Sequence, residues 1–325
     1  MSSSWEIGVR VFAGLAMIGL AVALAIYLRC RSVATWKPYR AGACCFVASQ
    51  VVHVPFNIFV LTPAFAVMDW DLTTAAHDSS VTLVAMALAL GLSAGICEET
   101  TRWSYFRYIC RSSDNNDSSS YNFAFMVGAG HGGCEAILAG YIALMTVVGM
   151  SFLKAHPDKI PSGEQHDAVT KAITDYWAAS TGQVLMAPVE RIWAMTFHLA
   201  ASILVWQAAT RARGTSQDGR QPASWYYYYG AAVAFHTLLD AAAVFCLMTW
   251  GVYAVELCLG LTAFPLSCYI LWYYYYKHSN LPVLLPLQQQ PTGVVSPSVA
   301  PGDQQPAVDH DEMANTCSEE DPLVT

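Results

Sequence analysis

Residues 81–103 read VTLVAMALALGLSAGICEETTRW, and this stretch decides the fold. Its first part, Val81 to Gly95, is apolar, yet it leads directly into Glu98, Glu99 and Arg102. Each ionised side chain at membrane depth costs roughly 2.5 to 3.5 kcal/mol on insertion scales. If this stretch is a membrane-spanning helix, neighbouring helices should therefore carry polar partners that offset the cost.

The composition is that of a membrane protein with several spans. Of the 325 residues, 55% are hydrophobic and only 12% are charged, and the mean hydropathy is +0.36. An ordinary soluble core cannot enclose that much apolar surface. Much of the net charge of -8 comes from carboxylates after Lys277, a region without Lys or Arg, so the remainder is close to neutral. Nothing in this distribution indicates a nucleic-acid partner.

Seven apolar segments are long enough to cross a bilayer, which predicts an all-α, polytopic membrane helix bundle. The first has no basic region or small-residue cleavage site ahead of it, so we expect an uncleaved span. Lys and Arg gather in the first, third and fifth loops but not in the second and sixth, which places the N-terminus outside and the C-terminus in the cytosol. The approximate spans are 7–28, 41–67, 81–103, 121–150, 184–208, 225–249 and 252–276.

Two segments outside the spans carry predictions of their own. Residues 1–277 are predicted to form the membrane domain, and 278–325, rich in Pro, Gln, Ser and acids, a disordered acidic cytosolic tail. In the fourth loop, 151–183, apolar residues from Ala168 to Trp177 recur at helical spacing between charged ones. That pattern predicts an amphipathic helix on the membrane surface, which serves as a connector or as a gate over a buried site.

Polar side chains in four different spans fall at one predicted depth. Counted from the cytosolic end of each span, Glu98, His131, His198 and His236 are 10 to 13 residues in, or roughly 15 to 20 Å at 1.5 Å per residue. We therefore expect one polar site near mid-bilayer, built from residues 92–240 and opened from the cytosolic half.

Spacing within each helix adds further residues to this site. His131 and Glu135 are four residues apart, as are His236 and Asp240, so each carboxylate could orient its imidazole or join it at one ligand. The predicted catalytic residues are Glu98, Glu99, Arg102, His131, His198 and His236, supported by Glu135, Glu190, Arg191 and Asp240.

Such a group of acids and imidazoles could hydrolyse a peptide bond. A carboxylate in a low-dielectric pocket can take a proton from water, and imidazoles can hold the developing oxyanion. His131, His198 and His236 could also bind zinc with an open fourth position. No HExxH is present, so zinc does not follow from a motif.

The charged groups also have structural interpretations. Glu98, Glu99 and Arg102 could form a salt-bridged turn at the membrane interface if the third span ends early. Glu190 and Arg191 could be a charge pair that anchors the outer half of their helix. Under these interpretations, the spans would carry unrelated buried charge.

Other polar residues receive no catalytic role from the sequence. We expect His53 to be a packed, hydrogen-bonded residue, and Glu256 to reach the interface along its own side chain. Most of the ten cysteines fall in apolar runs and no CxxC occurs, so we interpret those as small apolar residues.

Together these residues resemble the YhfC family of intramembrane metalloproteases. The motifs run in family order from Leu92 to Asp240, and each is weak without the others. The matching strings are Glu98-Glu99-Thr100-Thr101-Arg102-Trp103, the run GAGHGGCEAIL at 128–138, Glu190-Arg191 with His198 and Ser202, and His236-Thr237-Leu238-Leu239-Asp240.

The family is similar in motif plan to a wider group of membrane proteins: CAAX-processing proteases, PrsW-type proteases and the non-catalytic anterior-pharynx-defective subunit of gamma-secretase. This resemblance implies that Glu98 and Glu99 include the base that activates water, and that His131, His198 and His236 complete the site. The CAAX enzymes space the acid pair and the arginine by one residue more than this chain does. Prenylated substrates are therefore not implied.

The function expected from the sequence is an intramembrane peptidase that uses a glutamate-activated water, with or without zinc. Its partners would be the lipid bilayer and a membrane-protein or peptide substrate. Three alternatives stay open at this point: a non-catalytic membrane scaffold, a proton-coupled transporter, and a haem-binding electron carrier that uses histidines. The sequence does not identify which membrane holds the protein.

Overall fold

The computed structural model describes residues 4–31, 35–109, 121–160, 162–163, 165–213 and 224–279. These residues contain no strand, and seven helical stretches among them are long and apolar enough to cross a membrane. The prediction of an all-α membrane bundle with seven spans is confirmed. The spans are α1 (Ser4–Arg31), α2 (Trp36–Phe56) continued by η1 (Asn57–Leu61) and α3 (Thr62–Val67), α5 (Ser80–Ser104) continued by η2 (Tyr105–Ile109), α6 (Tyr121–Ala155), α8 (Thr181–Arg213), α9 (Trp225–Trp250), and α10 (Val252–Leu261) with α11 (Ala263–Ser279).

The connections hold more helix than the sequence pattern indicated. A short helix, α4 (Leu72–Asp78), lies in the second loop and was not predicted. In the fourth loop η5 (Pro157–Lys159) is followed by α7 (Gln165–Ala178), which confirms a helix at that place. Residues 280–325 lie outside the described part of the chain, so the disordered tail and the orientation of the bundle in the membrane stay predictions.

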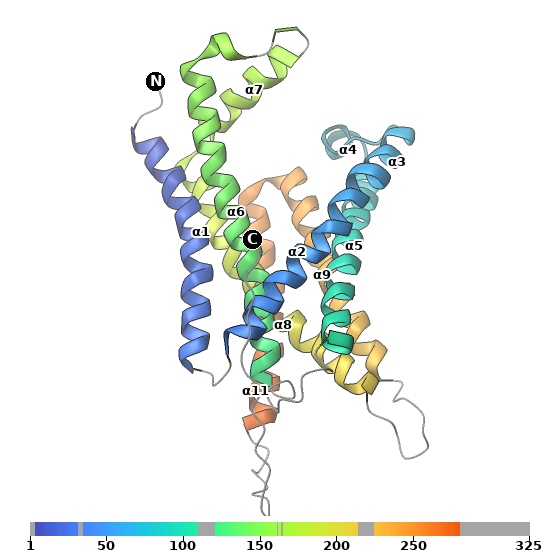
Figure 1. The fold of residues 1–325 in the computed structure, drawn as a ribbon. Coiled ribbons are helices and arrows are strands. Elements are labelled where there is room, and N and C mark those ends of the chain that lie inside the picture. The colour runs from blue at the N-terminus through green and yellow to red at the C-terminus, as the bar shows by residue number, and fades with distance from the viewer. Residues whose placement is uncertain are drawn as a thin grey trace, which may run out of the picture. The chain divides into compact units, whose positions relative to one another are not determined.

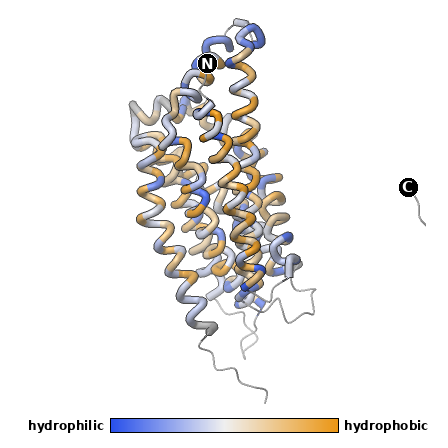
Figure 2. The backbone as a smooth tube through the Cα atoms, turned by 90° about the vertical axis from the view of Figure 1, so that its left-hand side faces the viewer, coloured by the Kyte–Doolittle hydropathy of each residue, from blue (hydrophilic) through white to orange (hydrophobic). Residues whose placement is uncertain are grey.

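The helices pack as a bundle around α6 and α8 (Figure 1). α6 packs against α1, α2 and α8, whereas α5 packs mainly against α9, and α9 in turn contacts α8 and α10. Of the seven spans, α8 is the most enclosed by the others. Hydrophobic residues extend along the helices, and hydrophilic residues gather mainly toward their ends (Figure 2).

Glycines permit the close crossing of α2 and α6. A Cβ added at Gly130 would overlap with the backbone carbonyl oxygen of Tyr39, and one added at Gly42 would overlap with that of Val127. Such contact between backbones needs residues without a side chain. Helix packing therefore accounts for glycine at these two positions.

The two ends of the bundle differ, and we name them by the helices found there. The α11 end, where α11 reaches Ser279, contains a packed aromatic cluster drawn from α6, α8, η2 and α11. The α7 end, where α1 begins, carries α7 (Figure 1). The buried aromatic members of the cluster at the α11 end are Phe106, Phe123, Trp206 and Tyr274.

α7 is fixed to the bundle at its C-terminal half. Ile173 and Trp177 are buried, and Arg10 of α1 donates hydrogen bonds to the carbonyl oxygens of Tyr176 and Ala179 at 2.7 and 3.2 Å. A cationic side chain suits the last carbonyls of a helix, where the dipole is negative. The apolar face of α7 therefore packs partly onto the bundle, in addition to any contact with lipid.

Candidate active site

The acidic stretch of α5 lies inside the bundle. Glu98 is 6% exposed, and Glu99 and Arg102 are 0% exposed. The helix continues past them to Ser104. The alternative of a salt-bridged turn at the membrane interface is therefore wrong, and the charges need partners from other helices.

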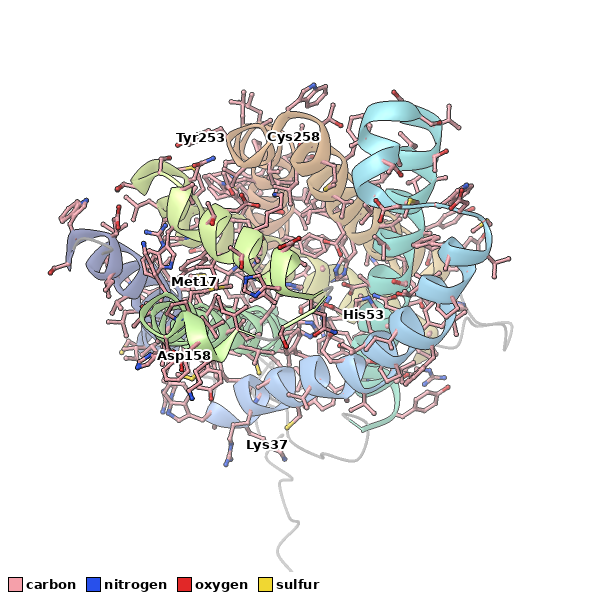
Figure 3. The ribbon with its side chains drawn as sticks, turned by 90° about the horizontal axis from the view of Figure 1, so that it is seen from above. Met17, Lys37, His53, Asp158, Tyr253 and Cys258 are labelled. Atoms are coloured by element: carbon pink, nitrogen blue, oxygen red, sulfur yellow. The ribbon has the colours of Figure 1, made fainter. Side chains whose placement is uncertain are left out.

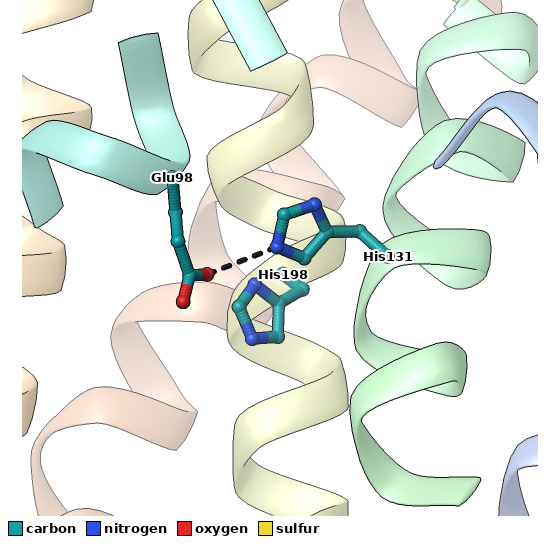
Figure 4. A group of neighbouring side chains, drawn as sticks. All are labelled: Glu98, His131 and His198. Carbon is teal, nitrogen blue, oxygen red and sulfur yellow. Dashed lines mark hydrogen bonds and ion pairs between the residues drawn. The ribbon is translucent and has the colours of Figure 1, made fainter. Parts of the chain in front are cut away.

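Glu98, His131 and His198 come together from three different helices, α5, α6 and α8 (Figure 4). Nε2 of His131 lies 2.9 Å from Oε2 of Glu98. One ligand atom from each of the three residues lies within 4.8 Å of the other two. All three side chains are buried, so this group is a candidate metal or water site in a low-dielectric setting.

Glu99 faces a different set of partners from Glu98. Arg102 donates to Oε2 of Glu99, and Oε1 lies 2.8 Å from Nδ1 of His236. Arg102 also contacts Nδ1 of His198 at 3.1 Å through its other terminal nitrogen. Both oxygens of Glu99 are thus engaged, so this carboxylate is held in place by its neighbours.

Because Nδ1 of His236 contacts Glu99, the second ring nitrogen, Nε2, is directed toward Glu98. Nε2 of His236 lies 3.8 Å from Oε2 of Glu98 and 3.5 Å from Oδ2 of Asp240. The expected pairing of His236 with Asp240, one helical turn apart, is confirmed. If Nδ1–H donates to Glu99, Nε2 faces two carboxylate oxygens, and ionised carboxylates only accept hydrogen bonds.

Glu135 was expected to orient His131, and here the structure differs. Its Oε2 lies 2.6 Å from Nε2 of His198 on α8, and its Oε1 accepts a hydrogen bond of 2.7 Å from Arg191. Arg191 also donates to Glu190. The pairing is wrong because α8 packs against α6 and turns toward Glu135 a histidine and an arginine, which attract a carboxylate more strongly.

The second span contributes polar residues that the sequence reasoning assigned no catalytic role. The amide nitrogen of Gln50 donates to Oε1 of Glu98 at 3.0 Å. His53 is hydrogen-bonded to neighbours on α2 and α5, as predicted, and lies between these helices in the view from the α7 end (Figure 3). The sequence does contain a pattern that could have predicted these polar residues to share one face of the second span. Gln50, His53 and Asn57 are spaced by three and four residues in an apolar segment.

Glu256 is buried, which makes the prediction that it reaches the interface wrong. It is 8% exposed and accepts a hydrogen bond of 3.0 Å from the indole nitrogen of Trp193. Packing of α10 against α8 encloses this carboxylate. In the described part of the chain no hydrogen bond or ion pair joins it to Glu98, His131 or His198, so it is a buried acid outside the group around Glu98.

The polar groups of the site differ in exposure along the bundle. The side chains of Glu135, Glu190 and Asp240, which lie on the α7 side of the three buried residues Glu98, His131 and His198, are 26%, 33% and 34% exposed. Toward the α11 end the polar side chains are enclosed and the aromatic cluster follows. The expectation that the site opens from the cytosolic half stays a prediction.

The residues around Glu98 suit a divalent metal. One carboxylate and two imidazoles form the kind of three-ligand set that catalytic zinc uses with an open position. His131 presents Nε2 to Glu98, and its buried Nδ1 has no hydrogen-bond partner among the described residues. Five carboxylates face only two guanidinium groups, those of Arg102 and Arg191, so neutral imidazoles leave an excess of negative charge that a cation would offset.

Comparison with known proteins identifies one related family. Residues 16–259, more than half of the chain, match the family of YhfC intramembrane metalloproteases. The length of this match is sufficient to assign the chain to that family. No curated protein and no solved structure matches the chain. The matched region contains every residue of the site described above.

Proposed function

We propose that this chain, which belongs to the YhfC intramembrane metalloprotease family, cleaves a membrane-embedded peptide segment with a water activated at Glu98. One observation carries the proposal. Glu99 and Glu135 each accept from an arginine, whereas the described contacts of Glu98 are with an amide and imidazoles. A carboxylate without a fixed cation beside it is free to take a proton from water or to bind a metal ion, so Glu98 is the reactive carboxylate of this proposal.

The other residues then have distinct tasks. Glu98 accepts the proton of the water and returns it to the leaving amine, while His236, whose Nε2 lies 3.8 Å from Oε2, stabilises the developing negative charge. Glu99 fixes the orientation of His236 through Nδ1. Arg102 keeps Glu99 in place, so Glu99 is a positioning residue and not the base.

The metal implied by the family name would be held by Glu98, His131 and His198, and the donor set favours zinc. Bound there, it would polarise the substrate carbonyl and make the water more acidic. Glu135 would support this group, because its contact with Nε2 of His198 helps to fix the orientation of that ring, whose Nδ1 is contacted by Arg102.

The substrate is expected to be a membrane segment because the site is enclosed by spans. Water is expected to enter at the α7 end, where the half-exposed acids lie. A peptide bond inside a helix is shielded by its own hydrogen bonds, so the segment must unwind locally near Glu98 before it can be attacked.

The test is cleavage of membrane-spanning peptides by the purified protein in liposomes, with products identified by mass. Glu98→Gln removes the proton acceptor and should lower the rate by about 10² to 10⁴-fold, as for loss of a general base. Glu256→Gln, the matched change at a buried acid outside the site, should leave the rate within about twofold of the wild-type rate. Wild-type rates in Glu98→Gln would overturn the proposal.

Metal analysis of the same preparations tests the ligand set. We expect wild-type protein to carry one zinc per chain, and His131→Gln and His198→Gln to lose it. Glu256→Gln should retain it. An unchanged zinc content in both histidine variants would show that the metal is bound elsewhere.

A further inference from the structure

A polar stripe on the second span runs from the site toward the α7 end. Gln50, His53 and Asn57 are spaced by three and four residues, so they lie on one face of α2 and its continuation η1. All three are half-buried, and they face Ser93 and Glu98 on α5. Asn57 opens η1, a π-helical turn two residues after Pro55, and such turns often occur at functional positions.

The hydrogen bonds of this stripe have one consistent direction. Gln50 must donate to Glu98, since the opposite amide orientation would set two acceptor oxygens against each other. The amide oxygen of Gln50 then faces Nδ1 of His53 at 3.3 Å, so the ring carries its proton on Nδ1. Nε2 of His53 is left to accept from the amide of Asn57 at 3.0 Å.

Ser93 completes the chain from the other helix. Its hydroxyl lies 2.9 Å from Oδ1 of Asn57 and 2.8 Å from the carbonyl oxygen of Leu90, so its one proton is shared between these two acceptors. The four side chains are thereby linked to one another. A connected network of hydrogen-bonded side chains favours one arrangement of its members.

We propose that Gln50 is a positioning residue for Glu98, held in its donating orientation by His53, Asn57 and Ser93. Its hydrogen bond occupies Oε1 and leaves Oε2 facing His131 and His236, at 2.9 and 3.8 Å. Without that hydrogen bond, the Glu98 carboxylate can rotate away from His131 and His236. The inference rests on the proposed function, because it assumes that Glu98 is the reactive carboxylate.

The first experiment compares Gln50→Met with wild type in the liposome cleavage assay and in zinc binding. Methionine keeps the length of the side chain and removes the donor. Loss of an outer hydrogen bond to a metal-site carboxylate lowers metal affinity or activity by about 10- to 100-fold, so we expect kcat and zinc affinity each to fall in that range with KM unchanged. Thr146→Val, which removes an exposed hydroxyl hydrogen bond to the carbonyl oxygen of Ile142 on α6, is the control and should change neither.

A second variant separates positioning from a purely structural role. Gln50→Glu sets a carboxylate against Glu98 near neutral pH, but the introduced carboxyl can donate once it is protonated. Activity relative to wild type should therefore recover as the pH is lowered, whereas the ratio for Gln50→Met should stay constant. A structural role would give two constant ratios.

The possible failures are distinguishable. If Glu98→Gln cleaves at the wild-type rate, the proposed function fails whatever Gln50 does. If Glu98→Gln is inactive while Gln50→Met stays within about twofold of wild type in kcat and zinc affinity, the positioning role alone fails. Constant relative rates of Gln50→Glu across the pH range would overturn it as well.

Discussion

The buried ion pair of Glu99 and Arg102 allows a quantitative prediction of stability. Both side chains have 0% exposure, and His236 contacts the second oxygen of Glu99 at 2.8 Å. Glu99→Gln preserves the size of the side chain but leaves the guanidinium group buried without its carboxylate. Removing one partner of a buried pair costs about 3 to 5 kcal/mol, because the other charge stays uncompensated.

The expected size of the effect follows from this cost. Since about 1.36 kcal/mol corresponds to a factor of ten, the ratio of folded to unfolded protein should fall by roughly 150- to 5,000-fold in Glu99→Gln. The double variant Glu99→Gln with Arg102→Met removes the stranded charge as well. It should be more stable than Glu99→Gln alone, so the two changes should not be additive.

The assay is unfolding in mixed micelles with increasing denaturing detergent, followed by circular dichroism. Glu256→Gln is the control, because this buried acid is paired with the neutral indole of Trp193 and its loss strands no charge. A cost below about 1 kcal/mol for Glu99→Gln, together with additive changes in the double variant, would refute the reasoning. Glu99 would then be free to act as the base in place of Glu98.

Two further predictions concern packing and access. Gly130→Ala should destabilise the fold by about 1 to 3 kcal/mol through overpacking against the backbone of Tyr39, whereas Gly149→Ala, which has open space around it, should not; equal unfolding midpoints would contradict the close crossing of α2 and α6. A cysteine at Asp240 should react with a membrane-impermeant thiol reagent added at the α7 side, above the background of wild type, and one at buried Ser202 should not; labelling of Ser202→Cys alone would place the water path at the α11 end.

The sequence was sufficient for the spans and for the level of the site within them. Apolar length decides whether a helix can cross a bilayer, and this property is local to each segment. Helical rise then sets the depth of each polar residue, so Glu98, His131, His198 and His236 could be assigned to one level before any packing was known. The structure brings all four together, as that depth required.

Partner choice within the site could not be obtained in this way. Helical spacing shows which residues share a face of one helix, but it does not show which neighbour that face meets. Glu135 therefore contacts His198 and Arg191 on α8 and not His131 on its own helix. For the same reason the role of Gln50 could not be predicted. A functional role for an amide in an apolar span depends on its partner, here the Glu98 carboxylate on another helix.

The stretch at 81–103 shows the same division. Its sequence alone determined that two acids and an arginine enter the membrane region and that other helices must compensate them, because the cost of burying charge is a property of the residues themselves. Only the tertiary structure decided that Arg102 neutralises Glu99 and leaves Glu98 to His131, His236 and Gln50. That outcome depends on how five helices rotate and pack against one another, which no single segment encodes.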